Sequence, residues 1–190
     1  MVKGNLFEKV FFLLNFESKE KSTIMFRTIE DFLNAWSYEN QVTETLLRQL
    51  TDNSLNQKVY DEGRSLGQLV WHIAGSIPEI LNRAGLELDE IDDSLDAPQS
   101  ADELRQAFSK AADQVKEQVL AKWLDSELEN EVNMYGEMWS KGKILTVLIL
   151  HQAHHRGQLT VLMRQAGLVV TGVYGPAKEE WSSMGMTAAK

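Results

Sequence analysis

Residues 144–167 read ILTVLILHQAHHRGQLTVLMRQAG, and their apolar side chains would cover almost every face of a helix. A helix of this kind lies among other helices rather than at the surface of a protein. Gly167 suits the left-handed conformation in which many helices end. The segment therefore predicts a long helix, starting near Lys141, at the centre of a helical protein.

Three further segments have the apolar spacing and the capping residues of helices, and they cover about 28–50, 65–85 and 100–123. The second and third begin with capping boxes, Ser-x-x-Gln at 65–68 and Ser-x-x-Glu at 100–103. Four helices are therefore expected in all.

Residues 129–139, before the last helix, alternate loosely between apolar and polar side chains around Gly136. This pattern favours an ordered loop, and a small hairpin is the alternative. A second connection of similar length covers about 86–99. The predicted fold class is all-α: an antiparallel four-helix bundle with an ordered loop or small hairpin before the last long helix.

The chain of 190 residues is long enough for one domain with a full core. The sequence after Met25 is typical of the start of a domain, so residues 25–190 are expected to form it. Residues 1–24 are interpreted as an N-terminal extension that either lies upstream of the native domain or comes from a misassigned start.

Composition excludes several classes of function. A net charge of −9, with no run of Lys and Arg to offset it, disfavours binding to nucleic acid. No segment has the roughly 18 apolar residues that a membrane span needs, and no secretory signal is recognisable. The absence of cysteine excludes disulfides, thiolate ligands and a cysteine nucleophile. A soluble cytoplasmic protein is expected, and any thiol chemistry would need a thiol from outside the chain.

Three of the four histidines lie within five residues, at positions 151, 154 and 155. Residues four apart on a helix project from the same face, with Cβ atoms roughly 5–6 Å apart, so His151 and His155 could share a metal ion. His154 stands three residues after His151, and spacing alone does not decide between the two pairs.

A third ligand must come from elsewhere, and His72 is the remaining histidine. Three histidines with one open coordination position are the simplest complete set. The alternative for His72 is a hydrogen-bonded core residue, which a lone histidine on an apolar face usually is. Gln152 stands where zinc proteases of the H-E-x-x-H type have the glutamate that acts as general base.

Several polar residues near these histidines have two interpretations. Gln68 and Gln158 are candidates to accept an imidazole N–H, and capping or solvated roles are the alternative. Arg156 is expected either to bind a substrate carboxylate or to form a surface ion pair. Tyr174 and Trp181 are expected to belong to a C-terminal segment that packs over the helices as a structural cap, with Trp181 as its anchor.

Three sequence elements together resemble the DinB-like family, part of the DinB/YfiT superfamily. They are Leu-Val-Trp-His-Ile at 69–73, His-x-x-x-His-Arg-Gly-Gln-Leu at 151–159, and Gly-Val-Tyr-Gly-Pro-Ala-Lys-Glu-Glu-Trp at 172–181. The resemblance covers about residues 25–190. It implies a four-helix bundle in which three histidines bind a divalent metal.

The resemblance maps the metal ligands onto His72, His151 and His155 and leaves His154 outside the pattern. The superfamily includes metal-dependent enzymes that use low-molecular-weight thiols, such as mycothiol-dependent maleylpyruvate isomerase and bacillithiol S-transferases. It also includes damage- or stress-induced members whose reaction is unassigned. Three imidazoles accept zinc, nickel, iron or copper, and zinc or nickel is expected. The relatives imply a small-molecule substrate or thiol as the partner, and a homodimer.

The function expected from the resemblance is therefore metal-dependent S-transfer with a thiol such as bacillithiol, in detoxification or stress response. A non-catalytic metal-binding stress protein and a metal-dependent hydrolase are the alternatives, because water in the open position would be acidified in the same way as a thiol. No residue of the chain is assigned as catalytic.

Overall fold

The computed structural model describes residues 25–187, and the extension expected at residues 1–24 lies outside the described residues. Four long helices make up most of this part. They are α2 (Ile29–Leu47), α3 (Leu66–Arg83), α4 (Ala101–Lys122) and α5 (Lys141–Gln165).

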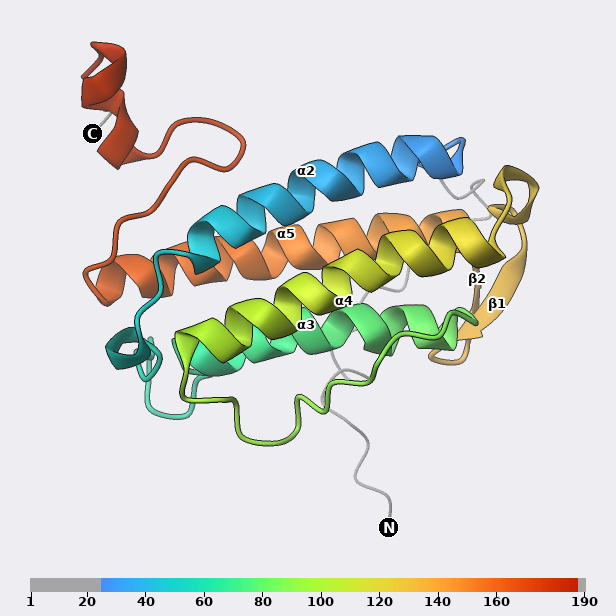
Figure 1. The fold of residues 1–190 in the computed structure, drawn as a ribbon, viewed down its shortest axis with the longest axis horizontal. Coiled ribbons are helices and arrows are strands. Elements are labelled where there is room, and N and C mark those ends of the chain that lie inside the picture. Colours follow the sequence, from blue (N-terminus) through green and yellow to red (C-terminus); the bar gives the residue numbers. More distant parts are fainter. Residues whose placement is uncertain (1–24, 188–190) are drawn as a thin grey trace.

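The four helices pack side by side around one core, with α3 against α4 and α5, and α2 against the same two helices. In Figure 1, α2 and α5 run in one direction, and α3 and α4 run in the other. The antiparallel arrangement expected from the sequence therefore applies to α2 with α4 and to α3 with α5. Helices α3 and α4 are parallel because the connection 84–100 returns along the outside of the molecule. All four helices contribute apolar side chains to the core, among them Phe32, Trp36, Leu46, Ile73, Ile77, Phe108, Val115, Leu145 and Leu148.

The helices begin at the caps that the sequence predicts. The Ser65 hydroxyl accepts a hydrogen bond from the Gln68 backbone at 3.2 Å, and the Gln68 side chain accepts one from the Ser65 backbone at 2.9 Å. The hydroxyls of Thr28 and Ser100 cap α2 and α4 by accepting the backbone N–H groups of Asp31 and Glu103, which is one half of the reciprocal pair seen at α3 and of the capping box predicted at 100–103. Each cap satisfies backbone N–H groups that the first turn of a helix leaves without an internal partner.

A hairpin precedes α5. The sequence favoured an ordered loop at this place, with a small hairpin as the alternative, and the structure has the hairpin. Strands β1 (Glu131–Met134) and β2 (Glu137–Ser140) pair antiparallel. Between them Tyr135 and Gly136 have φ values of 57° and 92°, and such a pair of left-handed residues matches the twist of a two-residue hairpin. The Tyr135 hydroxyl donates to the Glu79 carboxylate at 2.7 Å, which ties the hairpin to α3.

Three 3-10 helices complete the described part: η1 (Asp52–Ser54), η2 (Asp125–Glu127) and η3 (Lys178–Met184). Between residues 25 and 187, no helix combines the length and the apolar character that crossing a membrane requires.

Candidate metal centre

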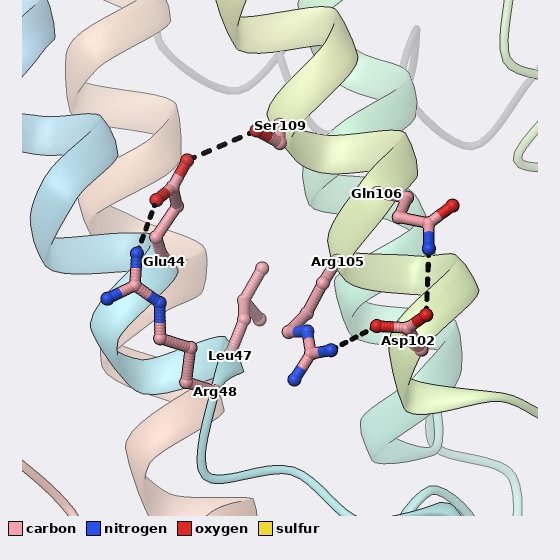
Figure 2. A pocket seen from close by; sticks show the side chains of 7 residues that line it. All are labelled: Glu44, Leu47, Arg48, Asp102, Arg105, Gln106 and Ser109. Carbon is pink, nitrogen blue, oxygen red and sulfur yellow. Dashed lines mark hydrogen bonds and ion pairs between the residues drawn. The ribbon is translucent and has the colours of Figure 1, made fainter.

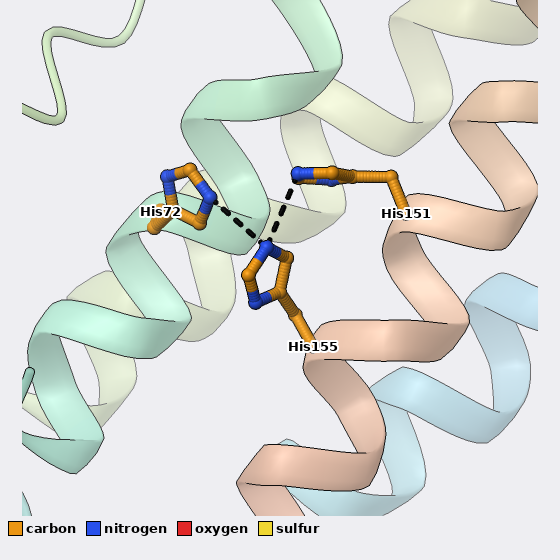
Figure 3. Close-up of side chains that lie close together, drawn as sticks. All are labelled: His72, His151 and His155. Atoms are coloured by element: carbon orange, nitrogen blue, oxygen red, sulfur yellow. Dashed lines mark hydrogen bonds between the residues drawn. The ribbon is translucent and has the colours of Figure 1, made fainter. Parts of the chain in front are cut away.

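Three histidines meet at the contact between α3 and α5 (Figure 3). His72 comes from α3, and His151 and His155 come from successive turns of the antiparallel helix α5. The Nε2 atom of His155 lies 3.2 Å from Nε2 of His72 and 3.1 Å from Nε2 of His151. His72 and His155 are buried, and His151 is half-buried. The pair on α5 is therefore His151 and His155, which the spacing alone left undecided.

The spacing of these nitrogens fits a divalent ion. Zinc binds imidazole nitrogen at about 2.0–2.1 Å, and two ligands of a tetrahedral site are then about 3.3 Å apart. The two separations at His155 are close to this value, and all three residues offer a nitrogen within 4.8 Å of the others.

The outer nitrogens of two of the rings are held by acceptors. Nδ1 of His72 lies 2.5 Å from Oδ2 of Asp93, and Nδ1 of His155 lies 2.8 Å from Oε1 of Gln158. A carboxylate and an amide oxygen accept hydrogen bonds, so each Nδ1 carries the proton and each Nε2 presents a lone pair. Two lone pairs facing each other at 3.2 Å repel, and a cation between them would convert this repulsion into attraction. The donor set thus fits a metal ion.

Burial also favours the neutral, ligand-competent form of the rings. Burial, reinforced by the neighbouring imidazoles, lowers the pKa of His151 to about 3. Burial likewise lowers the pKa of His155 to about 4, although its hydrogen bond to Gln158 acts in the opposite direction. Near pH 7 both rings are therefore neutral.

The predicted neighbours of the histidines differ in outcome. Gln158 contacts His155 as expected, and its amide nitrogen also lies 3.1 Å from Nε2 of His154. Gln68 instead caps α3. His154 is exposed and stands outside the group of three, as the resemblance implies.

The contact between Asp93 and His72 was not found from the sequence. Asp93 lies in the connection between α3 and α4, 21 residues after His72, in an acidic run that has no helical spacing. The one local signal is Gly75, one turn after His72, where the connection passes close to α3.

Arg156 fits neither of the two interpretations given to it. It follows His155 directly, but one residue further along a helix is rotated by about 100°, so its side chain faces α2. There it is 2% exposed and forms an ion pair with Glu39, and it donates to the Thr43 hydroxyl at 3.0 Å and to the Tyr174 hydroxyl at 2.6 Å. Arg156 is therefore a buried structural residue.

The C-terminal segment is attached to the helices through Tyr174. Its hydroxyl donates to the Glu39 carboxylate at 2.8 Å, and the Tyr38 hydroxyl on α2 donates to the carbonyl of Val173 at 2.6 Å. The indole N–H of Trp181 donates to Pro176 within the same segment. In Figure 1 the helix η3 stands away from the four long helices. The segment is therefore held to α2 by Val173 and Tyr174, and Glu179 of η3 pairs with Arg164 of α5 at 3.4 Å. Trp181, the expected anchor, makes its hydrogen bond within the segment.

A cavity of about 410 Å³ lies between the end of α2 and the start of α4 (Figure 2). Arg48 pairs with Glu44 on α2, and Arg105 pairs with Asp102 on α4. Because each arginine is neutralised within its own helix, the cavity has no net charge to attract an ion. It lies at the seam between α2 and α4, whereas the histidines lie at the seam between α3 and α5.

The fold and the cluster define a helical protein with a potential three-histidine metal centre. The family model that describes the DinB family matches residues 25–188, and the chain belongs to this family.

Three proteins from Bacillus species are similar over most of the chain. The uncharacterized protein YrdA of Bacillus subtilis (strain 168) is 39% identical over 166 residues, which are 87% of this chain and 99% of YrdA. The crystal structure of a DinB-like protein from Bacillus cereus ATCC 10987 has a TM-score of 0.76 and 41% identity, and the match covers 79% of this chain and all of that one. The crystal structure of the DinB-like protein YjoA of Bacillus subtilis, at 18% identity, has a TM-score of 0.58 over 77% of this chain and 99% of that one, and shows the same fold.

Proposed function

We propose that this protein is a cytoplasmic, metal-binding four-helix bundle whose ion is held by His72, His151 and His155. We further propose that it is an S-transferase that uses a low-molecular-weight thiol, such as bacillithiol, in detoxification or stress response. The metal-binding part rests on Nε2 of His155, which lies about one tetrahedral edge from Nε2 of both His72 and His151. The resemblance to thiol-using members of the superfamily supports the thiol.

Three neutral imidazoles would leave a divalent ion with its full charge and one open position. Such an ion would lower the pKa of a bound thiol enough to make it a nucleophile at neutral pH. The chain supplies no cysteine of its own, so the thiol must come as a second substrate. Its residues orient the imidazoles through Asp93 and Gln158 and shield them from water by burial.

Zinc or nickel is the proposed metal, since imidazole ligands suit both. We test this by elemental mass spectrometry of protein purified without an affinity tag. About one ion per chain is expected, and it should be lost in His155→Ala and retained in His154→Ala. A protein that stays metal-free after incubation with zinc or nickel would contradict the metal site.

The thiol is tested separately, by titrating the metal-loaded protein with bacillithiol and following proton release. Binding that releases a proton is expected. Tight metal binding without any response to a thiol would favour the non-catalytic metal-binding stress protein instead.

We also propose a homodimer. Leu150 and Val161 are about half exposed on the outer face of α5, and nothing lies within 4 Å of the position where Gly157 would carry a Cβ. A second copy of the helix could approach closely there and cover both apolar side chains. Light scattering after size exclusion should give twice the mass of the chain, and Leu150→Glu should give a monomer.

A further inference from the structure

We propose that Asp93 is a positioning residue for the metal site, which holds the His72 ring so that its Nε2 faces the ion. This inference rests on the metal site proposed above. Oδ2 of Asp93 lies 2.5 Å from Nδ1 of His72, while Nε2 of the same ring lies 3.2 Å from Nε2 of His155. Figure 3 shows the second nitrogen of the His72 ring pointing away from the cluster.

The position of Asp93 excludes a role as a direct ligand. It contacts the edge of the imidazole opposite to Nε2, so the ring stands between its carboxylate and the meeting point of the three histidines. A carboxylate there accepts the Nδ1 proton, which fixes the tautomer in which Nε2 carries the lone pair. It also fixes the rotation of the ring and makes the imidazole a stronger electron donor.

The connection that carries Asp93 has no helix or strand, yet it is held at several points. The indole N–H of Trp71 donates to the carbonyl of Asp92 at 3.1 Å, and the side chain of Asn82 bonds both backbone groups of Leu88 at 2.8 and 3.0 Å. Trp71 directly precedes His72, and Asp92 directly precedes Asp93, so this hydrogen bond holds Asp93 beside His72. The geometry of the pair is thereby set by α3 itself.

Gly75 allows the connection to come this close. A Cβ at this position would lie 3.1 Å from Cβ of Asp93 and 3.2 Å from the carbonyl oxygen of Ile91. Both distances are shorter than ordinary van der Waals contact, and one of the two atoms belongs to the backbone. Glycine in the middle of a helix is unfavourable by roughly 1 kcal/mol relative to alanine, and here it gives the carboxylate room to reach His72.

The test compares Asp93→Ala and Asp93→Asn with the matched control Asp92→Asn. Asp92 is the neighbouring carboxylate of the same connection, and its side chain accepts hydrogen bonds from Ser94 rather than from a histidine. Zinc affinity is measured by competition with a chromophoric chelator. Loss of such a hydrogen bond typically weakens metal affinity about 10–100-fold, so Asp93→Ala should fall in this range and Asp93→Asn between it and the wild type. Asp92→Asn should change the affinity by less than about threefold.

A second readout separates orientation of the ring from stability of the connection. In metal-free protein, ¹⁵N shifts of His72 should report the proton on Nδ1 in the wild type and in Asp92→Asn, and a mixture of tautomers in Asp93→Ala. Wild-type zinc affinity or an unchanged tautomer in Asp93→Ala would overturn the inference while leaving the metal site intact, provided that His155→Ala still loses zinc. A wild type that binds neither zinc nor nickel would instead overturn the metal site itself.

Discussion

Replacing Arg156 with methionine is expected to destabilise the protein strongly. Methionine keeps an unbranched apolar chain but has no charge and no hydrogen-bond donor. The guanidinium makes an ion pair with the Glu39 carboxylate and donates to the Glu39 carbonyl, the Thr43 hydroxyl and the Tyr174 hydroxyl. The variant would leave a carboxylate that is 7% exposed without its cation.

The magnitude follows from the burial of the pair. Removal of one partner from a buried ion pair usually costs about 3–5 kcal/mol, because the other charge is left in the interior without compensation. Both side chains are almost fully buried, so a loss of roughly 3–5 kcal/mol in the free energy of unfolding is expected at pH 7.

Urea unfolding followed by circular dichroism at pH 7, with chelator present, measures the loss. The double variant Arg156→Met with Glu39→Gln is the control, because it removes the charge that the single variant leaves behind. It should recover at least about half of the loss. A loss below about 1 kcal/mol in the single variant, or a double variant that is no more stable than the single one, would refute the reasoning.

Three further predictions concern the metal site and the helix that carries its first ligand. In metal-free protein the free energy of unfolding should fall as the pH drops from about 6.5 toward 4, by up to about 1.4 kcal/mol per histidine and pH unit. The reason is that His151 and His155 take up protons in the unfolded chain but have pKa values of about 3 and 4 in the folded one. A flat profile in urea unfolding at pH 7, 6 and 5 would contradict this. Zinc at 100 times its dissociation constant should stabilise the protein by about 2.7 kcal/mol and raise the Tm by about 5–10 °C, as scanning calorimetry can show, and it should leave the Tm of His155→Ala unchanged. Gly75→Ala should weaken zinc affinity, and urea unfolding should show no gain of the roughly 1 kcal/mol in stability that helix propensity favours, because the added Cβ would press on Asp93 and Ile91.

The features that could be predicted from the sequence depend on neighbours along the chain. Ser65 and Gln68 cap α3 because a capping box is complete within four residues. His151 and His155 share a face because they are one turn apart. The addition of His72 to this pair needed the resemblance, since periodicity alone did not distinguish a ligand from a core histidine.

The features that could not be predicted join residues that are distant in the sequence. Glu39 and Arg156 are separated by 117 residues, and no local pattern shows that both would face the same seam. The parallel course of α3 and α4 depends on the path of an irregular connection, whose length alone allows either direction. Asp93 lies on that same connection, so its contact with His72 could be foreseen only after the path was known.

The structure also explains why the buried residues of α5 are not confined to one stripe. Its residues 151 and 155 face α3, and the next residue after this pair, Arg156, faces α2. The helix is thus held on one side by a buried ion pair and on another by the histidine cluster, and a third, outer face that includes Leu150 and Val161 is exposed. Because Arg156 follows His155 directly, the ion pair with Glu39 sets the rotation of α5, and this rotation sets the direction in which both of its cluster histidines point. A residue that makes no contact with the cluster therefore helps to determine its geometry.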